Sequence, residues 1–151
     1  MAQPRTGVER RADALAKLAE TEADVWVATA SPDGHEYLVP LSYAWDGEHV
    51  ILATEPGFVT ARNIAASGRA RLGFGPTRDV LIVDAVLATQ VGAGAVPAEL
   101  ADRYARQSGW DPRLEPAPYV YLLMRPVRVQ AWREANELEG RTIMRDGEWL
   151  Y

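Results

Sequence analysis

The chain contains no cysteine, one lysine, two histidines and two phenylalanines among its 151 residues. Without cysteine it has no disulfide bond, no thiolate nucleophile and no zinc site with sulfur ligands, and a reducing compartment is its natural setting. His35 falls in a turn and His49 at the start of an apolar segment, and the two are not spaced as metal ligands. We therefore expect no metal centre and no catalytic triad built on histidine.

Long apolar runs are also lacking. The N-terminal stretch is charged throughout and has no hydrophobic core of a signal peptide, and the longest stretch with a single charge, residues 80–98, includes polar residues and two glycines. A long buried strand explains that stretch better than a membrane span does. We expect a cytoplasmic protein with no membrane partner. The net charge of −5 argues against a general nucleic-acid binder, which usually has a basic face.

What remains is ordinary globular material, with 48% apolar and 25% charged residues. Its length suits a single domain over residues 1–151. Because Lys17 is the only lysine, any anion site must be built from arginine, whose guanidinium can bind phosphate through two parallel hydrogen bonds.

Hydrophobic periodicity and turn residues predict six strands and three helices. A helix lies within residues 1–22, where Thr6 and Glu9 form a capping box. The expected strands are residues 24–30, 36–45, 49–54, 69–75, 78–91 and 119–132, and the other helices are residues 58–67 and 97–109. Residues 133–151 form a mixed tail. Sequential strands with helices at the crossings indicate a mainly β (α+β) fold, a small closed or half-open antiparallel barrel with flanking helices.

The strand at residues 36–45 alternates large and small side chains. Pro40 cannot donate to a sheet ladder, so it marks an edge, a bulge or a stretch that meets something other than a strand. Small residues such as Pro40 and Ser42 beside irregular backbone leave room for a flat ring, whereas Leu41 falls on the face of large residues. The alternative is that this strand only packs against a helix or a second subunit.

The stretch ATEPGFVTARNIAASGRARLGFG, residues 53–75, gathers polar groups behind a Pro-Gly turn. Thr54 ends a strand, and Thr60, Arg62 and Asn63 fall at the start of the next helix, where free N–H groups and the helix dipole favour a phosphate. The alternative is a solvated helix cap.

Two further places offer candidate residues. Arg78 lies in a polar turn that leads into the longest strand, and Trp132 and Arg133 end the last strand, where an aromatic plane and a guanidinium can pack on a ring and bind its phosphate. A solvated hairpin corner explains Arg78 equally well, and Trp-Arg at a strand end is also common where a core is capped.

In their order, the segments VPLSYAWDG, LATEPGFVTARNI and SGRARLGFGPTRDV resemble the split-barrel flavin-binding family that includes pyridoxamine 5'-phosphate oxidase and the flavin/deazaflavin-dependent oxidoreductases. The resemblance covers roughly residues 8–132, and the tail resembles an actinobacterial subgroup. It implies a six-stranded antiparallel split β-barrel and a homodimer with the cofactor at the subunit interface.

The resemblance also implies roles for the candidate residues. The cofactor ring would lie near Pro40–Ser42, and its phosphate near Thr54 and Thr60–Asn63. Trp132 and Arg133 would reach it from the partner subunit. Many relatives have lysine at the position of Thr60, so the anion would depend more on Arg62 and Arg78. Further C-terminal substrate residues of the longer vitamin-processing oxidases are missing, and we do not expect pyridoxamine phosphate oxidation.

The function that this resemblance implies is hydride transfer between a bound cofactor, FMN or the deazaflavin coenzyme F-420, and a small conjugated substrate. The composition is typical of a GC-rich genome and inclines the choice toward the deazaflavin, although its polyglutamyl tail needs a basic groove that the dispersed arginines do not reveal. One alternative is a non-catalytic protein that sequesters a flavin, haem or another planar ligand. A second is a structural dimer without cofactor, in which Arg62 would pair only with neighbouring carboxylates.

Overall fold

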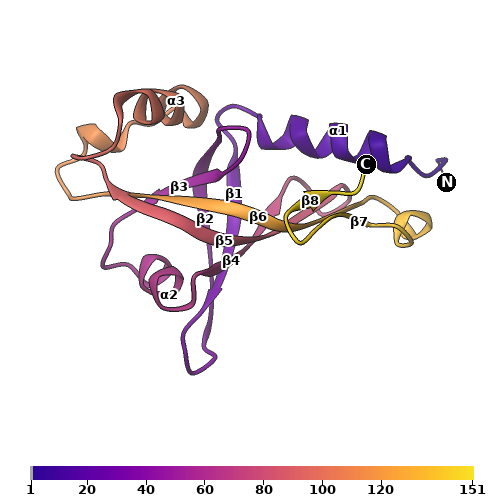
Figure 1. Ribbon diagram of the computed structural model, residues 1–151, viewed down its shortest axis with the longest axis horizontal. Helices are drawn as coiled ribbons and strands as arrows, with labels where there is room; N and C mark the ends of the chain where they lie inside the picture. The colour runs from indigo at the N-terminus through magenta and orange to yellow at the C-terminus, as the bar shows by residue number, and fades with distance from the viewer. Residues whose placement is uncertain (1) are drawn as a thin grey trace.

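The computed structural model describes residues 2–151 and shows an antiparallel β-barrel with three α-helices around it (Figure 1). The helices are α1 (Gly7–Leu18), α2 (Val59–Ser67) and α3 (Ala98–Ser108). The barrel strands are β1 (Asp24–Ala30), β2 (Glu36–Trp45), β3 (Val50–Thr54), β4 (Arg69–Phe74), β5 (Val80–Gly92) and β6 (Val120–Trp132). The predicted barrel of six strands is confirmed.

The strands close because β6 pairs with β5 on one side and with β3 on the other. The order β3-β2-β1-β4-β5-β6 therefore returns to β3 and leaves few free sheet edges. Two ladders of the barrel are short, since β2 pairs with β3 only at residues 43–45 and β1 pairs with β4 only at residues 26–28. We call the gap beside the β2–β3 ladder the split.

Local signals set the helix ends as expected. Thr6 caps α1 in a capping box with Glu9. Gly68 and Gly109 follow α2 and α3 with φ angles of 71° and 78°, the left-handed conformation that a glycine adopts without a steric penalty.

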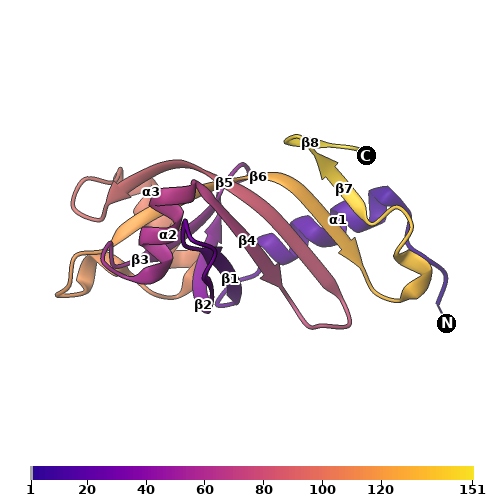
Figure 2. The same ribbon diagram turned by 90° about the horizontal axis from the view of Figure 1, so that it is seen from below.

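The tail continues the sheet. One edge of β6 pairs with β3 over residues 120–124 and then with β7 (Thr142–Arg145) at Val129 and Gln130. A tight turn leads on to β8 (Glu148–Trp149), and both strands lie beside α1 (Figure 2). The stretch that the sequence left as mixed is thus a hairpin that extends the sheet past the barrel.

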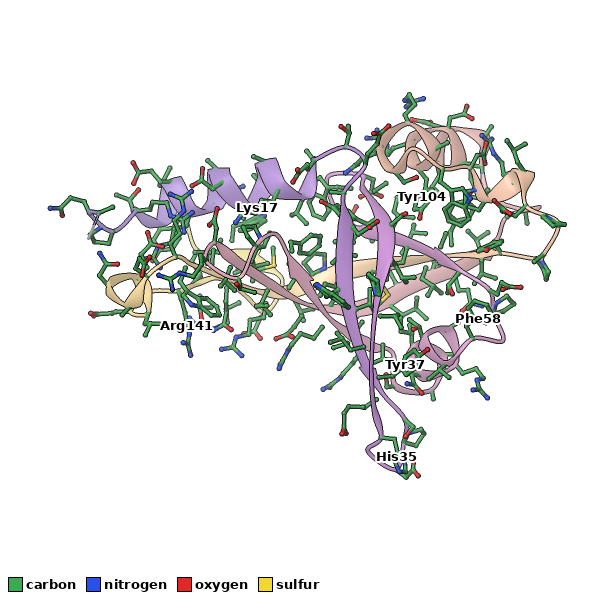
Figure 3. The ribbon with its side chains drawn as sticks, turned by 180° about the vertical axis from the view of Figure 1, so that it is seen from behind. Lys17, His35, Tyr37, Phe58, Tyr104 and Arg141 are labelled. Atoms are coloured by element: carbon green, nitrogen blue, oxygen red, sulfur yellow. The ribbon has the colours of Figure 1, made fainter. Side chains whose placement is uncertain are left out.

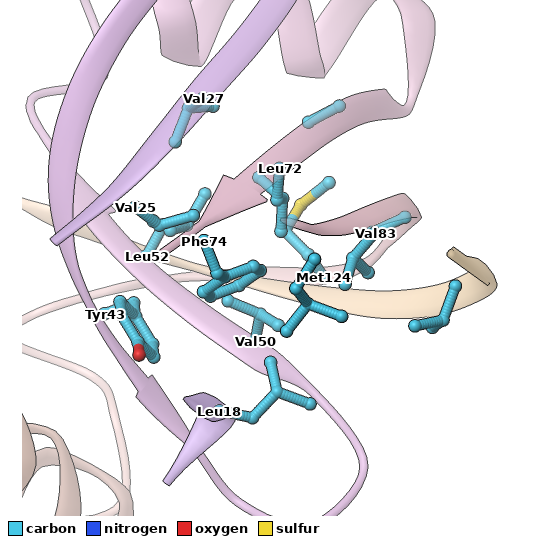
Figure 4. Packing of buried hydrophobic residues seen from close by; sticks show 14 of the residues in the cluster. Leu18, Val25, Val27, Tyr43, Val50, Leu52, Leu72, Phe74, Val83 and Met124 are labelled. Carbon is cyan, nitrogen blue, oxygen red and sulfur yellow. The ribbon is translucent and has the colours of Figure 1, made fainter. Parts of the chain in front are cut away.

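The barrel interior is filled by aliphatic side chains around Tyr43 and Phe74 (Figure 4). Their rings meet edge to face at 5.0 Å, and the Tyr43 hydroxyl donates to the Lys17 carbonyl at the end of α1 over 2.6 Å. Burial raises the pKa of Tyr43 to about 12. A second, smaller core lies between α3 and the outside of β2, β3 and β6, with Tyr104 and Tyr121 at its centre.

The β1–β2 hairpin projects away from the barrel as an arm, with His35 near its tip (Figure 3). Within residues 2–151, no helix has both the length and the apolar character that crossing a lipid bilayer requires.

Candidate functional site

The split between β2 and β3 lies where the sequence predicts contacts with a flat ligand. Pro40, Leu41 and Ser42 are paired with β1, but the ladder to β3 stops at Tyr43. On the side that faces β3, this part of β2 is therefore an edge, as the proline predicts. The split leaves main-chain groups without a strand partner.

The two faces of β2 differ as the alternation predicts. Leu41 packs against the main core, whereas Pro40 is exposed. Farther along, Ala44 is buried under α3, and the Ser42 carbonyl accepts a hydrogen bond from the Tyr104 hydroxyl over 3.3 Å. The face of small residues thus packs against α3 at Ala44 and is open at Pro40. Packing against a helix describes the first end of the strand, and room for a flat ring remains only at the second.

Beyond the split, α2 begins without a side-chain cap. Its N-cap residue is Phe58, which is 55% exposed and offers no oxygen to the first N–H groups of the helix (Figure 3). Arg62 lies one turn farther along, is exposed, and makes none of the ion pairs found in residues 2–151. An unpaired guanidinium beside an uncapped helix N-terminus can bind an anion.

The other polar residues of this stretch point inward. Thr54, Thr60 and Asn63 are all buried. The Asn63 side-chain amide donates to the Thr29 hydroxyl over 3.1 Å and so ties α2 to β1. Of the four predicted phosphate contacts, only Arg62 has its side chain in solvent.

Arg78, Trp132 and Arg133 lie at the opposite end of the barrel. Val120 on β6 is opposite Thr54, whereas Trp132 is opposite Val80, two residues after Arg78. Twelve residues of strand separate Val120 from Trp132, roughly 40 Å of contour at about 3.3 Å per residue. Within one chain the predicted residues therefore form two groups at opposite ends of β6.

The cations at this far end already have partners. Arg78 pairs with Glu134 at 3.0 Å, and Arg133 pairs with Asp79 at 3.1 Å. The ring of Trp132 is covered by the guanidinium of Arg141, 5.3 Å from the ring centroid. An incoming anion would have to compete with these carboxylates.

Next to this network, a buried ion pair joins the N-terminal segment to the C-terminal tail. Arg5 donates to both carboxylate oxygens of Glu137, from Nε at 3.1 Å and from Nη2 at 2.8 Å. Arg133 N–H donates to the same carboxylate, and hydrogen bonds from Arg5 are the main reason that the pKa of Glu137 is lowered to about 2. Arg10 is buried nearby and donates to the Glu137 carbonyl at 2.9 Å. We call these residues, Arg5, Arg10 and Glu137, the terminal clasp.

Three arginines that the sequence reading did not single out line a cavity of about 800 Å³ on the outside of the barrel. They are Arg69 and Arg71 on β4 and Arg128 on β6. The alternation R-A-R-L-G-F already places Arg69 and Arg71 on one outward face. The place of Arg128 beside them depends on strand pairing, which the sequence does not reveal.

No group of three or more histidine, aspartate or glutamate side chains in the described chain, residues 2–151, is placed to hold a metal ion.

A family model described as pyridoxamine 5'-phosphate oxidase matches residues 12–133. None of the curated proteins is significantly similar in sequence. Among solved structures, an F420 reductase is 26% identical over 74% of this chain and 92% of its own, with a TM-score of 0.58.

Two other solved structures share the fold at lower identity. A haem-binding protein from Mycobacterium smegmatis is 18% identical over 94% of this chain and 58% of its own, with a TM-score of 0.59. PhzG from Burkholderia lata 383, in complex with tetrahydrophenazine-1-carboxylic acid, is 18% identical over 94% and 86%, with a TM-score of 0.55.

Proposed function

The chain belongs to the pyridoxamine 5'-phosphate oxidase family, and from this premise we propose that it is an oxidoreductase that binds FMN or the deazaflavin coenzyme F-420 in the split between β2 and β3. The cofactor, when bound, supplies hydride transfer to or from a small conjugated substrate. The protein supplies position, charge and exclusion of water. The absence of cysteine and the scarcity of histidine are compatible with such a division of work.

The observation that carries the proposal is the free guanidinium of Arg62 beside the uncapped start of α2. Most other arginines near candidate positions are already paired with carboxylates, as Arg78 and Arg133 are. An exposed arginine without such a partner, next to three helical N–H groups and an open strand edge, is suited to the phosphate of a mononucleotide.

Across the split, the edge of β2 would border the ring. Neighbouring residues of a strand direct their main-chain groups to opposite sides, so Pro40 and Ser42 face the split whereas Leu41 faces β1. Pro40 has no N–H and the Ser42 carbonyl already accepts a hydrogen bond from Tyr104, which leaves the Pro40 carbonyl and the Ser42 N–H for the ring edge. In this proposal the side chains of Thr54, Thr60 and Asn63 shape the site from within the fold instead of touching the ligand.

We further propose that two copies of the chain complete the site. The outward face of β1 and β2 exposes Trp26 at 53% and Leu38 at 59%, and Pro40 lies opposite Trp26 in the ladder. Large exposed apolar side chains on neighbouring strands are typical of a protein interface. A second copy on this face would also account for the distance between Arg62 and Trp132 within one chain.

The similarity to an F420 reductase, 26% identical, favours the deazaflavin over FMN. The departures from the vitamin-processing oxidases in the tail remain the reason to exclude pyridoxamine phosphate as the substrate.

The decisive experiment titrates the purified full-length protein separately with FMN and with coenzyme F-420 and follows cofactor fluorescence. Gel filtration with light scattering measures the oligomeric state in the same buffer. We expect a dimer that binds one of the two cofactors, and turnover of the reduced cofactor with a conjugated acceptor. A monomer that binds neither would overturn the proposal, and tight binding without any turnover would favour a non-catalytic carrier.

A further inference from the structure

A groove on the outside of the barrel is lined by three arginines and a single carboxylate. It is the cavity of about 800 Å³ that lies between the end of β1, the end of α2 and the outer faces of β4, β5 and β6. It is distinct from the split, because its cations come from β4 and β6, whereas the split is bordered by β2 and β3.

The strand register places the cations of the groove in a defined pattern. Arg71 on β4 is opposite Asp84 on β5, and Asp84 is opposite Arg128 on β6. The two arginines therefore lie in the same cross-strand row with β5 between them. At about 4.8 Å per strand their backbones are roughly 10 Å apart. Arg69 lies two residues from Arg71 on the same face of β4, about 7 Å along the strand.

Only one of these three arginines is neutralised within the chain. Arg71 donates to Asp84 from Nε at 2.6 Å. Arg69 and Arg128 make none of the ion pairs found in residues 2–151, and Asp84 is the only carboxylate that lines the groove. The groove is therefore locally cationic although the chain has a net charge of −5. Such a local reversal of sign attracts anions.

The rest of the lining is mixed. Ala28, Val86 and Val127 are apolar, whereas the hydroxyls of Thr29, Ser31 and Ser67 and the Asp84 carboxylate are polar. A ligand that fills this groove would have both apolar and hydrogen-bonding parts, with charged groups at its margins.

We propose that this groove binds a small molecule with at least two negatively charged groups, carboxylates or phosphates, held by Arg69, Arg71 and Arg128. A single anion needs only one bidentate guanidinium. Three arginines whose backbones form a triangle of about 7 by 10 Å suit separate anionic groups on one ligand. The proposal does not require a cofactor in the split, but the groove adjoins the face proposed for the second copy, because Ala28 of the groove is opposite Leu38 in the ladder.

The test measures binding of citrate and of pyrophosphate to the full-length protein by isothermal titration calorimetry at constant ionic strength, with acetate as the singly charged comparison. We expect one or both multivalent anions to bind and acetate not to bind. Citrate alone would identify a carboxylate ligand, and pyrophosphate alone a phosphate ligand. Failure of both anions to bind would overturn the proposal, as would equal binding of acetate.

Variants then locate the binding. Arg69→Gln and Arg128→Gln should each weaken binding of the multivalent anion at least tenfold. Arg103→Gln on the exposed surface of α3 removes the same charge outside the groove and should leave the affinity unchanged. If Arg103→Gln weakens binding as much as the groove variants do, the effect is one of net charge and the proposal is wrong.

Asp84→Asn should change the affinity in the opposite direction, toward tighter binding. Because misfolding can only weaken binding, this variant separates an effect on the groove from an effect on the fold. It removes the carboxylate that occupies Arg71 and should tighten binding several-fold. Unchanged or weaker binding in this variant would also count against the proposal.

Discussion

Arg62 differs in its surroundings from three arginines at the other end of the barrel. At the end with α1 and the tail, Arg5, Arg78 and Arg133 all face carboxylates at 2.8–3.1 Å. At the split end, Arg62 is exposed and faces none within residues 2–151. The same side chain is a structural group at one end and a free cation at the other.

The position of an arginine in a sequence motif does not tell whether it binds a ligand or stabilises the fold. The presence or absence of a neighbouring carboxylate does. A buried pair such as Arg5–Glu137 is costly to break because one charge would be left alone in the interior. A free surface guanidinium costs little to remove from the fold. Substitutions at the two ends should therefore affect different measurements.

The largest effect is expected at the terminal clasp. Glu137→Gln removes the carboxylate that Arg5 faces and should lower the free energy of unfolding at pH 7 by about 3 kcal/mol. Urea unfolding followed by circular dichroism measures this. Glu48→Gln, in the exposed turn between β2 and β3, is the matched control and should change stability by less than about 0.5 kcal/mol. Equal losses in both variants would show that the clasp is not special.

Acid should weaken the clasp in a defined pH window. Because the folded-state pKa of Glu137 is about 2, below its usual 4.5, its contribution is present above pH 4.5 and is lost as the pH falls toward 2. The contribution amounts to about 3 kcal/mol, since each pKa unit is worth about 1.4 kcal/mol. Unfolding curves between pH 2 and 5 should show wild type and Glu137→Gln converging. Parallel curves would contradict the assignment.

At the split end the expected effect is on binding. Arg62→Ala should weaken the affinity for the preferred cofactor by about 1–3 kcal/mol, the scale of a lost charged hydrogen bond. Its free energy of unfolding should stay within about 0.5 kcal/mol of wild type, because Arg62 is exposed. Fluorescence titration measures the first quantity and urea unfolding the second. An unchanged affinity would contradict the proposal that the cofactor phosphate binds at the start of α2.

Asn63 is next to Arg62 in sequence but should behave as a structural residue. Asn63→Ala removes the buried hydrogen bond to Thr29 and should cost about 1–2 kcal/mol of stability. Asn136→Ala, which removes an exposed amide that donates to the Ala2 carbonyl, should cost less. If Asn63→Ala weakens cofactor binding as much as Arg62→Ala while the fold stays equally stable, Asn63 is a ligand contact after all.

Arg78 provides the smallest effect and the sharpest comparison between the two ends. Its side chain is 79% exposed, and its pair with Glu134 is a surface ion pair, so Arg78→Gln should change stability by at most about 1 kcal/mol. Because Glu134 already occupies it, we expect a smaller loss of cofactor affinity than in Arg62→Ala. A larger loss would show that Arg78 leaves Glu134 when the cofactor binds.

Much of the fold was predictable because its signals are local. The capping box at Thr6, the glycines that end α2 and α3, and the alternation along the strands all act within a few residues. The hairpin of β7 and β8 escaped prediction because its strands are short and draw their stability from pairing with β6.

The candidate site was predictable only in part. The sequence pointed to Pro40 and Arg62, which the structure places at a strand edge and in solvent. It could not tell that Asn63 faces Thr29, because residues 34 positions apart meet only after β1 and α2 pack together. For the same reason it did not bring Arg128 beside Arg71.

From the sequence came the order of the six barrel strands and the three helices, the family, and the kinds of side chain available for an anion site. Only the tertiary structure decided which of those side chains are free. An arginine is neutralised only if a carboxylate lies beside it, and strand pairing between segments distant in sequence determines which side chains lie beside it.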